Sequence, residues 1–304
     1  MARNQAYKVG GHLFFIELPE GSFLWEKMKQ SYGPFEICPE DQNDSIFSLE
    51  LCDEVEVEDA VLVYSNKDTV EEGFVTIEVF STPRGHYFEL TQPGSVQVNA
   101  RLLISTDLHD AELSLAGRPI EQWLIFNTAV DFCFLLSTAG KKTVLTHASS
   151  VIYKGKAYLF LGKSGTGKST HSRMWQTALD GVELMNDDHP ILRVDEDGKV
   201  VAYGSPWSGK TPCYKNISAP LGGIIRISRA PYNRPSRLLP IQAYASLMTS
   251  CSGMTWYKDM ADGRDRTLQS IVSVTPCWVM ECLPDTDAAI VCMKAVTGEL
   301  VQEA

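Results

Sequence analysis

One glycine-rich segment, residues 161–170, constrains the fold of this chain more than any other stretch. Within it Gly162 and Gly167 enclose four residues and are followed by Lys168 and Ser169, which is the spacing of the P-loop pattern. Its glycines let the backbone turn its N–H groups toward phosphate oxygens, the lysine reaches the β- and γ-phosphates, and the serine hydroxyl can ligate Mg²⁺. The segment therefore predicts a site for a nucleoside triphosphate. The predicted nucleotide-binding residues are Gly162, Lys163, Ser164, Gly165, Thr166, Gly167, Lys168, Ser169 and Thr170.

The residues on either side of this loop fit the same interpretation. Residues 157–161 are a short apolar run, which predicts a buried strand that leads into the loop. Residues 168–179 predict a helix that stops at Asp180-Gly181, and its positive N-terminal end would face the same phosphates. Strand, loop and helix thus follow one another in the order that the motif requires.

Length and composition narrow the possible functions. A chain of 304 residues can bury a substantial core and predicts two domains, or one large domain with an extension. The net charge of −11 argues against general nucleic-acid binding, which needs a basic face. Eight cysteines without a C-x-x-C pair indicate neither a zinc site nor a disulfide framework. We find no signal-peptide pattern and no apolar run of membrane-spanning length, so we expect no membrane partner and a cytoplasmic location.

The pattern along the chain predicts an α/β protein with two domains. Residues 1–100 are expected to form a β-rich region of unassigned role, with strands over 11–16, 60–64 and 74–80. Residues 101–304 are expected to form the nucleotide-binding domain. A helix over 120–139 is expected to pack against the sheet that follows it.

Within the second domain we expect a strand over 144–153 and a strand over 182–188 that lies beside the P-loop strand. A β-hairpin is expected over 191–203. The later elements expected are strands over 221–227 and 278–283, helices over 241–252 and 264–273, and a last helix from residue 285.

The adjacent carboxylates Asp187 and Asp188 close the strand after the P-loop helix. Phosphoryl transfer needs a carboxylate to hold the metal or to take the acceptor's proton, and two neighbours can divide these roles. A solvated Asp-Asp turn is the other interpretation. His147 precedes the loop, although a lone histidine on a strand is usually structural. Lys210 and Arg229 are candidates for stabilising the transferred phosphoryl group, with a plain surface role as the alternative.

With these residues the chain resembles the HPr kinase/phosphorylase-like family, whose P-loop core is shared with phosphoenolpyruvate carboxykinases. The resemblance rests on His147 within Thr-His-Ala-Ser, the 162–170 loop, and Asn-Asp-Asp at 186–188, in that order. It covers about residues 140 to 295. It implies an α/β fold with an HPr-kinase/carboxykinase-type P-loop core and a mixed sheet, to which the β-rich N-terminal region is added.

The resemblance also implies roles for these residues. Asp187 would be the acid/base that takes the acceptor's proton, His147 would tune it, and Lys168 would act on the phosphates. Asp188 and Ser169 would hold Mg²⁺. The cofactor would be ATP, with GTP or another phosphate donor also compatible, and relatives assemble as homo-oligomers. The family's arginine-rich motif near the C-terminal end of the sheet is not found, and residues 1–100 do not resemble the usual N-terminal domain.

Three hypotheses follow. The first is a Mg²⁺-dependent kinase that moves a phosphoryl group from ATP to a hydroxyl of a protein, a peptide or a small molecule. The second is a phosphoenolpyruvate-carboxykinase-like enzyme, and the third is a nucleotide-sensing module without rapid turnover.

Overall fold

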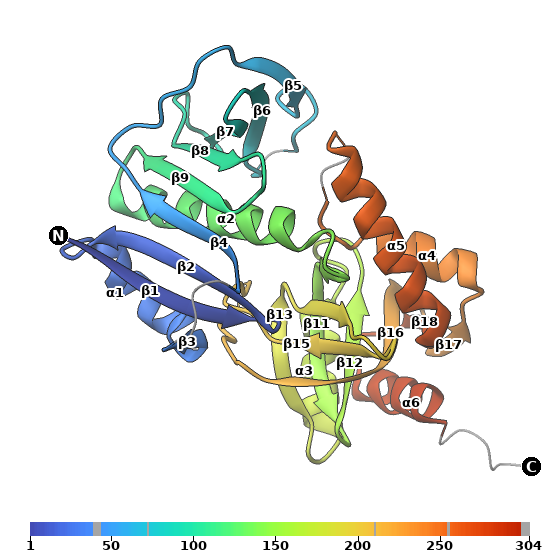
Figure 1. Ribbon diagram of the computed structural model, residues 1–304. Coiled ribbons are helices and arrows are strands. Elements are labelled where there is room, and N and C mark those ends of the chain that lie inside the picture. Colours follow the sequence, from blue (N-terminus) through green and yellow to red (C-terminus); the bar gives the residue numbers. More distant parts are fainter. Residues whose placement is uncertain (39–43, 72, 210, 254–255, 299–304) are drawn as a thin grey trace, which may run out of the picture. The chain divides into compact units, whose positions relative to one another are not determined.

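The computed structural model describes residues 1–38, 44–71, 73–209, 211–253 and 256–298. These residues form a mixed α/β protein with two compact units (Figure 1). The first unit is Met1–Thr138 with a short segment that ends at Lys258, and the second contains the rest of the described chain. The units therefore divide after Thr138, whereas the sequence analysis placed a boundary at residue 100. Among the described residues, no helix is long and apolar enough to cross a membrane.

The first unit is a nine-stranded mixed sheet in the order β3-β1-β2-β4-β9-β8-β7-β6-β5, with parallel pairing on both sides of β4. Its strands are β1 (Ala2–Val9), β2 (His12–Pro19), β3 (Glu36–Ile37), β4 (Ser45–Leu51), β5 (Val61–Ser65), β6 (Thr76–Thr82), β7 (Gly85–Thr91), β8 (Ala100–Ser105) and β9 (Asp110–Leu115). Its helices are α1 (Phe23–Ser31), the 3-10 turn η1 (Gly33–Phe35) and α2 (Pro119–Thr138).

Helix α2 belongs to this first sheet. It packs on β4, β8 and β9, which precede it in the chain, so the expectation that it covers the following sheet was wrong. The buried residues of α2 include Phe126, Val130 and Phe134. Phe134 also contacts β2, where its ring meets that of Phe14 edge-on at 6.3 Å. Residues 101–138 therefore share the core of the first unit.

The second unit is built on another mixed sheet, in the order β10-β14-β15-β16-β12-β11-β13. Strand β18 pairs with β16 in parallel, and β17 pairs with β18. Its strands are β10 (Thr143–Leu145), β11 (Ala148–Tyr153), β12 (Lys156–Leu161), β13 (Glu183–Asp188), β14 (Ile191–Val194), β15 (Val200–Tyr203), β16 (Ser218–Arg229), β17 (Arg234–Arg237) and β18 (Cys277–Cys282). Its helices are α3 (Lys168–Ala178), α4 (Pro240–Met248), α5 (Lys258–Val274) and α6 (Thr286–Thr297).

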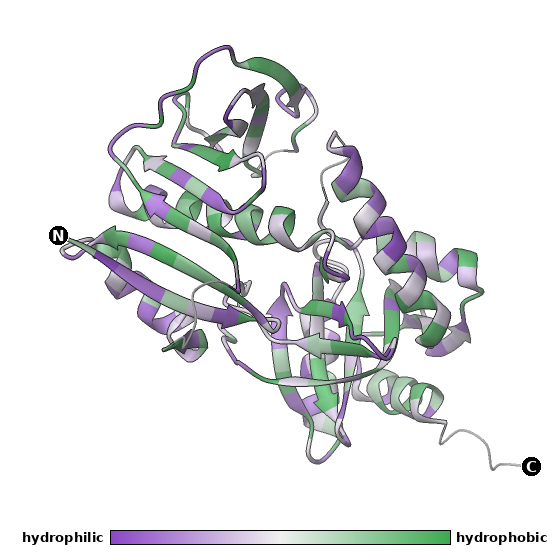
Figure 2. Ribbon diagram, in the orientation of Figure 1, coloured by the Kyte–Doolittle hydropathy of each residue, from purple (hydrophilic) through white to green (hydrophobic). Residues whose placement is uncertain are grey.

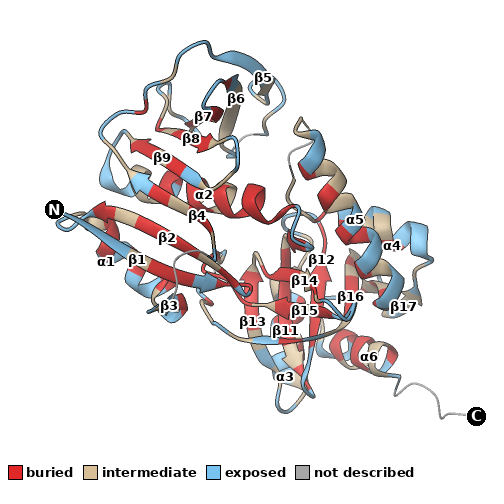
Figure 3. Ribbon diagram, viewed as in Figure 1, coloured by how far each residue is buried: buried red, intermediate tan, exposed pale blue. Residues whose placement is uncertain are grey.

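Strand β12 lies between two hydrophobic cores. Leu159 and Leu161 pack into the core under α4 and α5, whereas Tyr158 and Phe160 pack into the core under α3 and α6. Alternate side chains of a strand point to opposite faces, so an uninterrupted apolar run is what a strand covered on both faces requires. Figure 2 shows hydrophobic residues along the strands of this sheet, and Figure 3 shows β12 as mostly buried.

Strand β13 is not the neighbour of β12, which corrects the sequence expectation. It pairs with β11, and β11 separates it from β12. The cause is local: Lys154 and Gly155 both have positive φ, of 48° and 73°. Positive φ at both central residues is the geometry of a two-residue hairpin turn, so β11 folds directly back along one edge of β12. Strand β16 occupies the other edge in parallel.

The expected strand over 144–153 is two strands, β10 and β11, interrupted at Thr146 and His147. At this interruption the backbone N–H of Thr146 donates to the carbonyl of Pro190, and that of His147 donates to the carbonyl of Ser250. These bonds hold His147 at the end of the sheet where the glycine-rich loop begins.

Candidate functional site

The glycine-rich loop connects β12 to α3 and depends on three glycines. Gly162, Gly165 and Gly167 have φ of 154°, 75° and 118°, a region that other residues adopt only with strain. Gly167 is the N-cap of α3 and provides no side-chain cap. The first N–H groups of a helix without a side-chain cap are available to an anion, and the helix dipole favours negative charge there.

Lys168 links the loop to two other segments of the chain. Its Nζ lies 2.9 Å from Nε2 of His147 and donates to the carbonyl of Gly162 at 3.0 Å. Nδ1 of His147 lies 3.0 Å from Oδ1 of Asp188. Because an ammonium only donates, Nε2 accepts and the imidazole carries its proton on Nδ1, which donates to the carboxylate. The structure thus joins Lys168, His147 and Asp188 in one hydrogen-bonded row.

Burial and charge act in opposite directions on the two ends of this row. Burial lowers the pKa of Lys168 by more than the charges of Asp188 and Asp187 raise it. Burial raises the pKa of Asp188, but the hydrogen bond from His147 and nearby positive charge, including that of Lys168, outweigh it and leave that pKa below its ordinary value. The carboxylate of Asp188 is therefore held ionised beside the lysine.

Asn186 shapes the turn that presents the two aspartates. This fully buried side chain accepts through Oδ1 from the backbone N–H groups of Asp188 and His189, both at 2.9 Å. Through Nδ2 it donates to the carbonyl and hydroxyl oxygens of Ser205 and to the carbonyl of Trp207, at 3.1 to 3.3 Å. The sequence analysis treated Asn186 only as part of a motif, and its structural role needs the loop at residues 205–207.

Asp187 is the buried member of the pair. It pairs with Ser149 of β11 in the sheet register and is 7% exposed. Among the described residues no group hydrogen-bonds its buried Oδ1. A buried carboxylate oxygen without a partner costs free energy, and native proteins tolerate it mainly where it has a function. The described contacts of His147 are with Lys168 and Asp188. The expectation that His147 tunes the acidity of Asp187 therefore stays a prediction.

Three side chains at this end of the sheet form a potential metal site. Ligand atoms of His147, Asp188 and His189 all lie within 4.8 Å of one another. Two imidazoles and one carboxylate suit a transition metal such as Mn²⁺, whereas Mg²⁺ prefers oxygen ligands. Of the predicted magnesium pair, Asp188 belongs to this group, and Ser169 lies in the first turn of α3. The oxygens of that pair suit Mg²⁺ once phosphates complete its shell.

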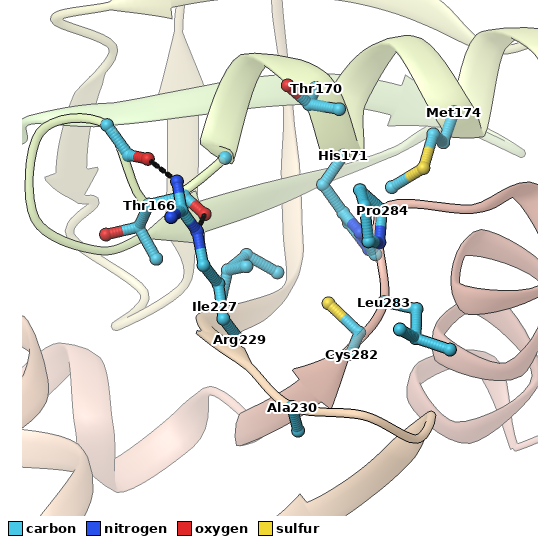
Figure 4. Close-up of a pocket in the computed structure, with 12 residues that line it drawn as sticks. Thr166, Thr170, His171, Met174, Ile227, Arg229, Ala230, Cys282, Leu283 and Pro284 are labelled. Atoms are coloured by element: carbon cyan, nitrogen blue, oxygen red, sulfur yellow. Dashed lines mark hydrogen bonds between the residues drawn. The ribbon is translucent and has the colours of Figure 1, made fainter.

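A cavity of about 350 Å³ lies beside the loop on the side of α3 (Figure 4). One wall comes from Thr170, His171 and Met174 of α3, and the other from β16 and the segment after β18. Arg229, at the end of β16, donates to the carbonyls of Gly165 and Thr166, the latter at 3.3 Å. Arg229 therefore supports the loop backbone. The other predicted cation, Lys210, lies outside the described residues.

A larger cavity, of about 640 Å³, lies on the other face of the sheet, beside α4. His147, Gly162 and Lys163 line its end at the glycine-rich loop, and Arg226 of β16 lines its wall. The sequence analysis missed Arg226. Its signal was a single charge in the apolar run Gly-Gly-Ile-Ile-Arg-Ile.

Comparison with known proteins adds a distant likeness. No protein-family model matches the chain, and no curated protein matches its sequence. Among solved structures, it is similar to the Hpr(Ser) kinase/phosphatase from Coxiella burnetii, with 11% identity and a TM-score of 0.30 over 51% of this chain and 95% of that chain. Because this likeness is distant, we take the roles of individual residues from the geometry of this chain alone.

Proposed function

We propose that this chain is a Mg²⁺-dependent phosphotransferase that moves the γ-phosphoryl group of ATP to an acceptor hydroxyl. The observation that carries the proposal is the position of Lys168. It stands at the end of a glycine-rich loop, in hydrogen-bonded connection with Asp188 and in the electrostatic field of the buried Asp187. Phosphate binding, metal binding and proton transfer would thereby all take place at one end of one sheet.

The loop and Lys168 would bind the triphosphate. The N–H groups of residues 162–170 would donate to phosphate oxygens, and Lys168 would exchange its bond to His147 for one to the β- and γ-phosphates. That exchange would replace bonds to neutral groups, the carbonyl of Gly162 and an imidazole nitrogen, by stronger charge-assisted bonds to phosphate oxygens. A magnesium ion on Asp188 and Ser169 would neutralise charge that develops on the phosphates.

Asp187 would act as the base. As the acceptor oxygen forms its bond to the γ-phosphorus, the hydroxyl proton passes to the Asp187 carboxylate, and the bond from that phosphorus to the β,γ-bridging oxygen breaks to release ADP. Oδ1 of Asp187 has no hydrogen-bond partner among the described residues, which leaves this carboxylate available to take a proton.

The cavity on the side of α3 would take the nucleoside. Its volume is within the range of small-ligand sites. Met174, Ile227 and Leu283, which line this cavity, would provide apolar surface for a base (Figure 4).

The test combines two measurements on three variants. We expect Lys168→Ala to lose Mg·ATP binding, and Asp187→Asn to keep binding while acceptor-dependent ADP release falls by about 10² to 10⁴. Asp180→Asn, an exposed aspartate after α3, is the matched control and should behave as wild type. Cell extract and a panel of hydroxyl compounds serve as acceptors. Tight ATP binding with no turnover in any of them would refute the transferase and favour the nucleotide-sensing module.

A carboxykinase-like activity is the second candidate, and one observation favours it. The nitrogen donors of His147 and His189 beside Asp188 suit Mn²⁺ better than Mg²⁺. This candidate predicts Mn²⁺- and nucleotide-dependent decarboxylation of oxaloacetate, lost in His189→Ala. If oxaloacetate is stable in the presence of protein, Mn²⁺ and nucleotide, the candidate is rejected.

A further inference from the structure

Arg226 is a cation in an apolar part of the second sheet. In the parallel register it lies opposite Leu161, the last residue of β12 before the loop, and its neighbours Ile225 and Ile227 are buried. Ile224, two residues earlier on the same face of the strand, packs in the core under α4 and α5. The Arg226 side chain therefore leaves the sheet toward α4, one residue from the phosphate loop.

The carboxyl end of α4 fixes this guanidinium in place. Nε donates to Oγ of Ser246 at 2.6 Å, and Nη2 donates to the carbonyl of Ser246 and to Oγ1 of Thr249, both at 2.7 Å. No carboxylate of the described residues forms an ion pair with Arg226, and none of its described hydrogen bonds uses Nη1. Burial lowers the pKa of this group.

An oriented, half-buried cation without a carboxylate partner is costly. The carbonyl end of a helix offers only a partial negative charge, worth less than a full counter-ion. A guanidinium has five N–H donors, and the bonds to α4 use three of them, so the N–H groups of Nη1 are left for an anionic oxygen. The neutral partners of Arg226 thus leave the requirement for an anion unmet.

The 640 Å³ cavity is where such an anion would bind. Among the described residues that line it, Arg226 and Lys163 are cations and none is an aspartate or glutamate. Leu238, Ala245 and Val279 make much of the remaining wall apolar. Its far end is lined by His147 and Gly162, so a molecule bound there would reach the phosphate loop from the face opposite the proposed nucleoside cavity.

We propose that this cavity is the acceptor site, and that its acceptor is a small organic acid with an apolar body and a hydroxyl group, whose carboxylate is bound by Arg226. This inference rests on the proposed transfer to a hydroxyl. The carboxylate end sits on the guanidinium, the apolar body lies along the wall under α4, and the hydroxyl faces the loop. The volume suits a molecule of this size.

The experiment measures binding, so that it does not depend on finding the natural acceptor. Hexanoate, 4-phenylbutyrate and indole-3-propionate are each compared with their primary amides in ligand-observed NMR titrations of the full chain, with and without Mg·AMP-PNP. We expect each acid to bind at least about tenfold more tightly than its amide, because the amide cannot form the charge-assisted pair. Arg226→Ala and Arg226→Gln should abolish this preference, and Arg226→Lys should keep part of it.

Arg266→Ala, an exposed arginine of α5, is the matched control and should keep the full preference. Retained Mg·AMP-PNP binding shows that an Arg226 variant is folded. Equal binding of acids and amides, a preference that survives Arg226→Ala, or no saturable binding of any acid in the millimolar range overturns the acceptor site. Lys168→Ala separates the two proposals, because it should lose AMP-PNP binding and keep the preference for acids.

Discussion

His171 gives a prediction whose magnitude follows from its burial. The side chain is fully buried on α3, its ring meets Phe160 edge-on at 4.8 Å, and Nε2 accepts from Nε1 of Trp175 at 3.2 Å. Burial lowers the pKa of His171 from 6.5 to about 4. The imidazole therefore stays neutral in the folded protein down to acid pH, because among the described residues no carboxylate offsets the effect of burial.

The sign and size follow from proton linkage. Since the folded-state pKa of His171 is depressed, the unfolded chain binds a proton that the folded chain does not as the pH falls below 6.5. The stabilisation that neutral His171 contributes to folding is complete above pH 6.5. It is lost progressively as the pH falls to the folded-state pKa of about 4. The total loss is about 3 kcal/mol, of which about 2 kcal/mol falls between pH 7 and pH 5.

The comparison variant is His171→Gln, which does not titrate and keeps an acceptor for Nε1 of Trp175. Urea unfolding of the full chain at pH 7, 6 and 5, followed by tryptophan fluorescence, gives the free energy of unfolding of both proteins. We expect wild type to lose about 2 kcal/mol more than the variant between pH 7 and 5. The reasoning would be refuted if both proteins lost the same free energy of unfolding between pH 7 and 5. It would also be refuted if the His171 imidazole titrated near 6.5 by NMR in the folded protein.

Three further predictions concern the loop and the aspartate turn. Gly167→Ala should cost about 1 to 2 kcal/mol because φ is positive there, whereas Gly140→Ala, in open space, should stay within about 0.5 kcal/mol by urea unfolding. Asn186→Ala should lower the free energy of unfolding by about 3 kcal/mol, because it removes buried hydrogen bonds. Asn4→Ala, at an exposed asparagine, should leave it unchanged. Equal effects of the two substitutions would contradict the role assigned to Asn186. Arg229→Ala should weaken Mg·ATP binding about tenfold by calorimetry, since it removes two bonds that support the loop; unchanged affinity would show that the loop needs no such support.

Local features of this protein were predictable because their causes are local. The run 157–161, the loop at 162–167 and the helix from Lys168 follow from side-chain periodicity and glycine spacing, and the structure has β12, the loop and α3 at those positions. The hairpin of β14 and β15 was confirmed for the same reason. The separation of His147 from β11 was missed, because it depends on bonds to Pro190 and Ser250, which are distant in the sequence.

The sequence by itself determined the strand, glycine-rich loop and helix at residues 156–178 and the aspartates that end β13. Only the tertiary structure decided that β11 lies between β12 and β13, that α2 joins the first sheet, and that Lys168 meets His147 and Asp188. It also revealed Arg226 beside the loop, held by the end of α4. The physical reason is that periodicity and glycine spacing act within a few residues, whereas strand order and side-chain contacts depend on which distant segments exclude water together.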